Sequence, residues 1–343
     1  MSRRHSISTK SQKLIQALSM SLPDRIRKKL VLPAFCAPMF LVSSPALVRE
    51  ACLAGIIGGL PRHNARTSDE FEHWLKSIHE ARQRAEMEDR PSGVLAVNLA
   101  SKARPEDMAS DLALCVKYNV DIIVNATGNP TELTKRSHDA GLLVFADAIN
   151  LKFAEKAIAA GVDGVTAIGA GGGGHSGSLS HFALVPKIRE IFDGTLIMAG
   201  CLSNGAAIRS AEVLGADLAY MGTRFIATQE SFASDEYKNL LLSQNAKDLS
   251  YTDKISGVAA NWMNESMRMA GLDPNHLPEL NPDMKYGGGH LPETVKPWIN
   301  LWSAGQGIEL IHDIPSVAEL VRSLIQEYEE ACLKPAFPGF NKR

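Results

Sequence analysis

Apolar and polar positions follow a repeating pattern from residue 31 onward. Short apolar runs typical of buried strands are each followed by a longer segment with apolar residues at helical spacing. Eight strand-like runs recur, and alternation of strand and helix predicts a parallel sheet. The runs are Val31 to Pro38, Ile56 to Leu60, Val94 to Leu99, Asp121 to Asn125, Leu143 to Asp147, Gly164 to Ile168, Thr195 to Ala199 and Leu218 to Gly222.

The expected helices carry start and stop signals at their ends. Ser, Thr and Asn are favoured N-caps, and glycine closes a helix because it adopts the left-handed conformation easily. The expected N-caps are Ser44, Thr67, Asn129 and Asn150, and the closing glycines are Gly55, Gly141, Gly161 and Gly215. The sequence therefore indicates both where these helices begin and where they end.

The position of the glycine-rich turns favours a closed (β/α)8 TIM barrel over a doubly wound open sheet, which eight units could also build. An open dinucleotide-binding sheet has its glycine-rich turn after the first strand, where this chain reads Ala37-Pro38-Met39-Phe40. The glycines instead follow the last three runs. Barrel loops after strands seven and eight commonly bind phosphate through bare backbone N–H groups. A nucleotide or flavin phosphate at Gly200, Gly222 and Thr223 is the leading hypothesis, and ordinary tight turns are the alternative.

His175 is the most informative single residue of the chain. It follows the sixth run among five glycines, at the strand end where barrel enzymes place catalytic groups. Its ordinary pKa near ~6.5 suits proton abstraction near neutral pH. A lone loop histidine is more often an exposed bystander, but the glycine context favours a catalytic base.

Composition narrows the function classes further. The chain has 343 residues, 45% of them hydrophobic, and a formal net charge of −2. This content argues against disorder, no apolar run reaches the ~20 residues of a membrane span, and the charge argues against nucleic-acid binding through phosphate neutralisation. Five cysteines in no metal-ligand spacing indicate neither disulfides nor a metal site and fit a reducing cytoplasm. A soluble protein that binds a small molecule is expected.

Two segments depart from the strand–helix pattern. Residues 1–30 carry eight Lys and Arg side chains but only one acidic side chain, Asp24, which indicates a basic extension. A surface helix with Leu14, Ile15 and Leu18 on one face is the preferred interpretation of this extension, and an organelle transit peptide is the alternative. Residues 226–297 predict a mainly helical domain that covers the barrel, with helices over 235–245 and 259–270 and then a loop rich in proline and glycine. The barrel itself would comprise residues 31–225 and 298–343.

Several short motifs together resemble the nitronate monooxygenase (2-nitropropane dioxygenase) family over about residues 30 to 330. They are Ala37-Pro38-Met39, Gly173-Gly174-His175-Ser176-Gly177, Ala199-Gly200, Gly215-Ala216-Asp217, Met221-Gly222-Thr223-Arg224-Phe225 and Trp302-Ser303-Ala304-Gly305-Gln306-Gly307. The resemblance implies a TIM-barrel protein with non-covalent FMN. It also implies a second, mainly helical domain over the barrel mouth.

The resemblance assigns roles to individual residues. It implies that Gly200, Gly222 and Thr223 bind the FMN phosphate, while Gly173 and Gly174 let the backbone approach the flavin. Ala37, Pro38 and Met39 would line the isoalloxazine ring, Asn98 would hydrogen-bond it, and Gln306 is a further flavin-side candidate. For Asn98, capping of a strand end is an equal alternative. His175 matches the active-site histidine of the family.

Two positions depart from the family pattern. Many members carry an acid shortly before the histidine, where this chain has Gly171 and Gly172. Asp147 ends the fifth run, where some relatives carry another side chain. It could accept a hydrogen bond from a ribityl hydroxyl or from substrate, or it could cap the next helix. A second histidine, His290, stands beside three glycines. An exposed bystander is the preferred interpretation of His290, and a second active-site histidine is the alternative.

The expected activity is FMN-dependent oxidation of alkyl nitronates, and of nitroalkanes, by O₂ to a carbonyl compound and nitrite. This expectation comes from the family resemblance. An FMN-dependent NAD(P)H reductase of a quinone or an enoyl thioester is the alternative, because it would use the same cofactor loops. The substrates are small molecules and O₂, and the sequence leaves open whether the chain forms a homo-oligomer.

Overall fold

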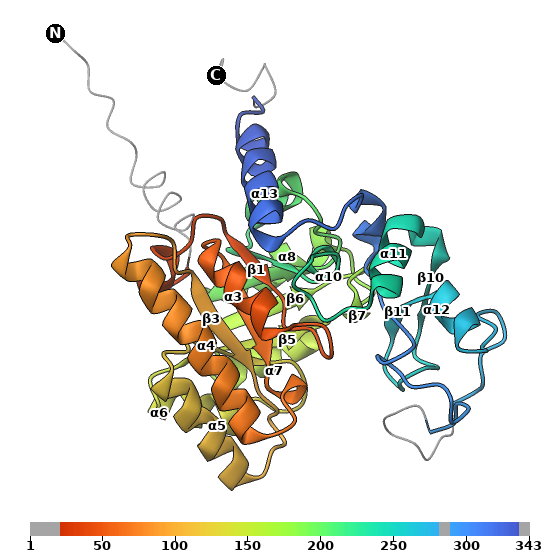
Figure 1. Ribbon diagram of the computed structural model, residues 1–343, viewed down its shortest axis with the longest axis horizontal. Helices are drawn as coiled ribbons and strands as arrows, with labels where there is room; N and C mark the ends of the chain where they lie inside the picture. Colours follow the sequence, from red (N-terminus) through yellow and green to blue (C-terminus); the bar gives the residue numbers. More distant parts are fainter. Residues whose placement is uncertain (1–20, 281–288, 336–343) are drawn as a thin grey trace.

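The structure, a computed structural model, describes residues 21–280 and 289–335, and its central element is a closed barrel of eight parallel strands (Figure 1). The strands follow one another in the order β1-β2-β3-β4-β5-β6-β8-β9, and β9 pairs with β1 to close the barrel. Their bounds are β1 Ala34–Cys36, β2 Ile57–Pro61, β3 Val94–Asn98, β4 Ile122–Asn125, β5 Leu143–Ala148, β6 Gly164–Ile168, β8 Thr195–Ala199 and β9 Leu218–Met221. Each predicted run overlaps one of these strands, and β2 and β5 each extend one residue past their runs, so the predicted barrel is confirmed.

Helices surround the barrel and begin and end largely where the sequence signals indicate. The Ser44, Thr67 and Asn150 side chains accept hydrogen bonds from backbone N–H groups three residues later. Helix α6 begins after Pro130 instead, and the expected cap Asn129 accepts from the N–H of Thr131. The helices are α2 Asp24–Arg27, α3 Pro45–Leu53, α4 Ser68–Met87, α5 Pro105–Lys117, α6 Thr131–Asp139, α7 Leu151–Ala159, α8 His181–Arg189, α9 Gly205–Leu214, α10 Thr223–Ile226 and α13 Val317–Cys332.

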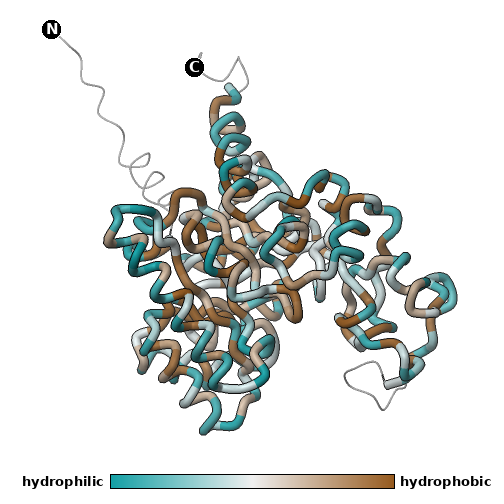
Figure 2. Tube along the Cα trace, in the orientation of Figure 1, coloured by the Kyte–Doolittle hydropathy of each residue, from teal (hydrophilic) through white to brown (hydrophobic). Residues whose placement is uncertain are grey.

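The hydrophobic core has two layers, inside the barrel and between the barrel and its helices. Figure 2 shows hydrophobic residues concentrated through the barrel and hydrophilic ones along the outer helices. Inside the barrel, Phe35 and Phe145 are almost fully buried. Leu22 and Ile26 join this inner cluster from the segment before β1, so these two side chains pack against the barrel interior. The expected helical face of Leu14, Ile15 and Leu18 lies outside the described residues.

A small second sheet stands beside the barrel, with strand order β10-β11-β7. Strand β7 (Gly174–His175) comes from the loop after β6, and β10 (Leu249–Thr252) and β11 (Ala260–Met263) form an antiparallel hairpin. Helix α11 (Asp235–Ser243) and helix α12 (Asn264–Met269) flank this sheet. Short 3₁₀ turns lie at Arg62–Asn64 after β2, at Ala246–Asp248 before β10 and at Gln306–Leu310 before α13. No helix within the described ranges has the length and apolar character needed to cross a membrane.

The helix predicted over 259–270 is wrong in its first half, which is strand β11. This strand pairs on both sides, with β10 and with β7, and all four of its residues are buried. A short apolar stretch fits strand and helix equally well, and here tertiary pairing decides between them. The helix predicted over 235–245 is α11, which ends two residues earlier.

Candidate functional site

A cavity of about 920 Å³ lies at the carboxyl ends of the barrel strands and contains most of the predicted site residues. Eight strands deliver side chains or loops to its wall, because parallel strands all end at the same face of a barrel. The predicted residues that line it are Ala37, Pro38, Met39, Asn98, Asp147, Gly173, Gly174, His175, Gly200, Gly222 and Thr223. Residues far apart in the sequence therefore share one site.

Gln306 is the predicted site residue that does not line this cavity. Its side chain is exposed, and its backbone N–H donates a 2.8 Å hydrogen bond to the carbonyl of Gly171. A side chain at Gly171 would collide with the Gln306 amide, since a Cβ there would lie 2.6 Å from Oε1. In this structure Gln306 therefore supports the glycine-rich loop from outside.

The structure constrains the two glycines expected at the phosphate site differently. Gly200 has a φ of +113°, and a Cβ at this position would lie 3.0 Å from Nε2 of His181. Gly222 has a φ of −103°, and its added Cβ would lie 3.6 Å from Met39 Sδ, an ordinary contact. Gly200 is therefore constrained by its backbone, whereas Gly222 keeps space open beside the cavity.

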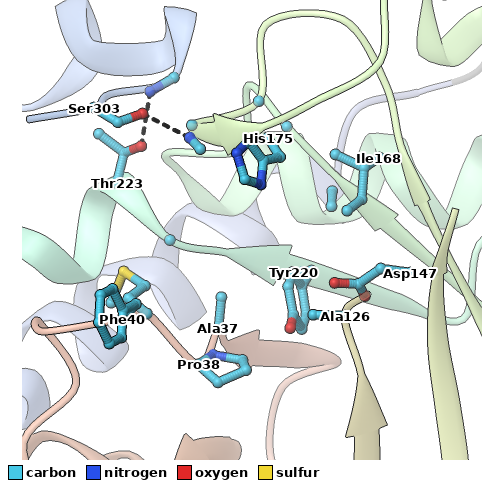
Figure 3. A pocket seen from close by; sticks show the side chains of 18 of the residues that line it. Ala37, Pro38, Phe40, Ala126, Asp147, Ile168, His175, Tyr220, Thr223 and Ser303 are labelled. Carbon is cyan, nitrogen blue, oxygen red and sulfur yellow. Dashed lines mark hydrogen bonds between the residues drawn. The ribbon is translucent and has the colours of Figure 1, made fainter. Parts of the chain in front are cut away.

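The segment 301–307 fastens the glycine-rich loop to the turn after β9 (Figure 3). Ser303 Oγ accepts a 2.6 Å hydrogen bond from the N–H of Gly174, and Thr223 Oγ1 accepts a 2.9 Å bond from the N–H of Gly305. Because the hydroxyl of Thr223 accepts in this bond, its own proton stays available for an anion in the cavity.

His175 lies in the short strand β7 rather than in a free loop. Its backbone pairs with Ala260 of β11, and its ring meets Trp298 edge-on with centroids 5.3 Å apart. Nε2 lies 3.1 Å from Oγ of Ser256. Burial lowers the pKa of His175 below its usual value, which favours the neutral imidazole that a general base needs.

Asp147 places a poorly solvated carboxyl in the cavity wall near Tyr220 (Figure 3). Its Oδ1 is shielded from solvent and has no hydrogen-bond partner among the described residues. Burial raises the pKa of Asp147 from 3.8 to about 7. An orphaned acceptor of this kind is costly unless a ligand donates to it, so the carboxyl is a candidate binding group.

The raised pKa of Asp147 predicts a pH-dependent effect on stability. In the unfolded chain the carboxyl ionises above about 4, but in the folded chain it ionises only near 7. Ionisation therefore penalises folding increasingly across this window, and the penalty is complete above pH 7. We expect ligand-free Asp147→Asn to melt a few degrees above ligand-free wild type at pH 8, with the difference vanishing at pH 4.

Differential scanning calorimetry at the two pH values checks this expectation. A melting difference that is the same at pH 4 and pH 8 would show that the Asp147 carboxyl is well solvated in the folded protein. Asp163→Asn is not a suitable control, since that carboxylate accepts from the N–H of Val144. Asp69→Asn, on the exposed first turn of α4, is the better control.

Asn125 was not predicted from the sequence as a site residue, and the roles of Asn98 and His290 were predicted only in part. Asn98 donates through Nδ2 to the carbonyl of Val124 at 2.9 Å, which agrees with the capping alternative, while the residue also lines the cavity. Asn125 ends β4, lines the cavity and has an orphaned Oδ1. His290 donates to the carbonyl of Lys254 and is not among the residues that line the cavity.

Similarity to known proteins identifies the family of this chain. The family model described as "Nitronate monooxygenase" matches residues 27–327. A nitronate monooxygenase of Paraburkholderia phytofirmans is 28% identical in an alignment 342 residues long. The alignment covers 87% of this chain and 93% of the relative. A nitronate monooxygenase of Pseudomonas aeruginosa is 28% identical over 213 residues, which cover 58% of this chain and 60% of the relative.

Solved structures share the fold at lower identity. Nitroalkane oxidase from Streptomyces ansochromogenes has a TM-score of 0.70 at 24% identity, covering 89% of this chain and 98% of that one. FabK from Thermotoga maritima has a TM-score of 0.68 at 21% identity, covering 91% and 97%. The structures support the barrel, and the family model establishes the kinship predicted from the sequence motifs. The chain belongs to the nitronate monooxygenase family and is a flavin-type oxidoreductase.

Proposed function

We propose that this chain uses FMN and O₂ to oxidise alkyl nitronates, and nitroalkanes after their deprotonation, to carbonyl compounds and nitrite. The observation that carries the proposal is that His175 shares one cavity with the phosphate-loop residues Gly200, Gly222 and Thr223. Family membership supports the same reaction.

The residues around the cavity suit a flavin mononucleotide. Among the described residues, no hydrogen-bond acceptor is found for the backbone N–H groups of Gly200 and Gly222, so both are free to donate to a phosphate. The hydroxyl proton of Thr223 is a third donor. Asp147 and Asn125 carry orphaned oxygens that hydroxyl or amide groups of a ligand would satisfy.

The chemistry divides between cofactor and protein. When bound, FMN supplies electron transfer and the reaction with O₂. His175 accepts the proton of a neutral nitroalkane or orients the anionic nitronate. Ala37 and Pro38 form the wall on the β1 side (Figure 3), together with the adjacent Met39. Tyr237 and Val258 line the cavity from the 226–297 segment. These last contacts support a covering role for that segment, which limits access of water.

The cofactor proposal predicts that the purified protein is yellow and releases FMN on heat denaturation. The glycine-containing loops after β8 and β9 offer hydrogen-bond donors for one terminal phosphate. The chain has no dinucleotide-binding fingerprint after its first strand. Chromatography and the absorption spectrum of the released chromophore check the result. Recovery of FAD, or a colourless protein that FMN does not reconstitute, would contradict the proposal.

Substrate assays test the reaction on the same preparation. We expect turnover of ethyl nitronate in air with release of nitrite. Rapid anaerobic bleaching of the flavin by NADH or NADPH, without turnover of any nitronate, would instead support the reductase alternative.

A further inference from the structure

The imidazole ring of His175 is hydrogen-bonded to the side chain of Ser256. Ser256 lies in the turn between β10 and β11 and is only 4% exposed. Its Oγ is 3.1 Å from Nε2 of His175 and 3.1 Å from the carbonyl oxygen of Val258. One hydroxyl group therefore connects the histidine to the backbone of the turn.

The direction of these two hydrogen bonds follows from chemistry. A carbonyl oxygen only accepts, so the hydroxyl proton of Ser256 is donated to Val258. The hydroxyl then faces His175 with a lone pair, and a bond to Nε2 requires that Nε2 carry the hydrogen. The neutral ring is thereby fixed with its free lone pair on Nδ1. No described residue hydrogen-bonds Nδ1, which stays accessible to solvent.

The surroundings keep this arrangement rigid. The backbone of Ser176 donates to the carbonyl of Ala259, and Tyr251 Oη donates to the carbonyl of Ser176 at 2.8 Å. The turn and the histidine strand are thus joined on both sides of the Ser256 contact. Trp298 packs edge-on against the imidazole and lies over Trp262, with centroids 4.4 Å apart. Rotation of the ring would break the Ser256 bond and this packing together.

Charged groups do not provide an alternative orienting force. Desolvation alone accounts for the lowered pKa of His175. The nearest basic side chain on the turn, Lys254, pairs with Glu279 at 2.5 Å, and His290 donates to the Lys254 carbonyl. The neutral hydroxyl of Ser256 is therefore the group that distinguishes the two ring nitrogens.

We propose that Ser256 is a positioning residue that holds neutral His175 as the Nε2–H tautomer, so that Nδ1 is the nitrogen that removes the substrate proton. This inference rests on the proposed function, in which His175 is the base. In the step, the C–H bond of a neutral nitroalkane breaks and an Nδ1–H bond forms. The electron pair of the C–H bond moves onto the nitro group, which yields the nitronate and an imidazolium still donating from Nε2 to Ser256.

The direct test is a long-range ¹H–¹⁵N correlation spectrum of histidine-labelled holoenzyme above the pKa of His175, with His175→Asn used to assign the signal. We expect His175 to show a protonated Nε2 and an unprotonated Nδ1. A protonated Nδ1 in the wild type would overturn the proposal. This readout needs no turnover, so it stands even if the protein oxidises no nitro compound and the proposed function fails.

The kinetic test compares Ser256→Ala with Ser256→Thr, which retains the hydroxyl. Loss of one hydrogen bond of ordinary strength corresponds to about a 2- to 12-fold effect. We expect Ser256→Ala to lose about this factor in kcat on nitroethane, to keep its rate on ethyl nitronate, and to show a mixture of tautomers, while Ser256→Thr recovers the wild-type signature. An unchanged tautomer and rate in Ser256→Ala, or an equal loss on both substrates with loss of flavin, would overturn the positioning role.

Discussion

Replacing His175 with Asn is expected to lower the rate on neutral nitroalkanes by roughly 10²- to 10⁴-fold, the usual contribution of a positioned general base. Nitroethane must lose a carbon-bound proton before it is oxidised, and the half-buried imidazole of His175, whose pKa is lowered by desolvation, is the group in the cavity placed to accept it. Ethyl nitronate has already lost that proton. Its oxidation by His175→Asn should therefore fall much less.

The measurement is the turnover of wild type and His175→Asn on both substrates, after flavin content and circular dichroism have been matched. Near-wild-type rates on both substrates would show that His175 is a bystander. An equal, large loss on both would indicate that His175 orients the nitronate rather than removing a proton. His181→Asn is not a suitable control, because His181 packs beneath Gly200 and donates to the carbonyl of Ala199. The exposed His276 is the better control position.

The barrel was predictable because its strands are buried on both faces. Such strands are continuous apolar runs, and the helices between them carry caps such as Ser44 and closing glycines such as Gly215, which has a φ of +107°. Each signal is local, so one sequence suffices to find it. The ends of the strands then identified the cavity wall, since parallel strands converge at one face.

The second sheet could not be predicted because its signals are not local. Strand β7 has only two residues, and it exists because Gly174 and His175 pair with Asn261 and Ala260 far along the chain. Nothing near His175 in the sequence indicates this pairing or the contact with Ser256. A polar residue such as Ser256, in an irregular turn, has no periodicity to reveal its partner.

The predicted phosphate loops show the same limit. The sequence identified Gly200 and Gly222 as a pair, on the general ground that glycine lets the backbone approach an anion. The structure separates them, because Gly200 adopts a positive φ and Gly222 does not. Backbone conformation depends on how each loop packs, so substitution at Gly222 is the cleaner test of the phosphate site.

Replacing Gly222 with Leu is expected to weaken FMN binding by at least tenfold, or about 1.4 kcal/mol. The space beside Gly222 is bounded by Met39 and Ala37, and a branched side chain would fill the approach to the backbone N–H groups. Gly222→Ala is the matched control: its Cβ lies 3.6 Å from Met39 Sδ and fits without displacing a neighbour. The φ of −103° is open to both residues, so neither variant strains the backbone at this position.

Fluorescence titration of the apoproteins with FMN measures the two dissociation constants, and thermal melts of the apo forms verify folding. We expect Gly222→Ala to bind FMN within a few-fold of wild type and Gly222→Leu to lose it on gel filtration. If folded Gly222→Leu keeps wild-type affinity, the phosphate does not lie against this turn. The proposed donors Gly222 and Thr223, which are adjacent in the turn after β9, would then both be wrong.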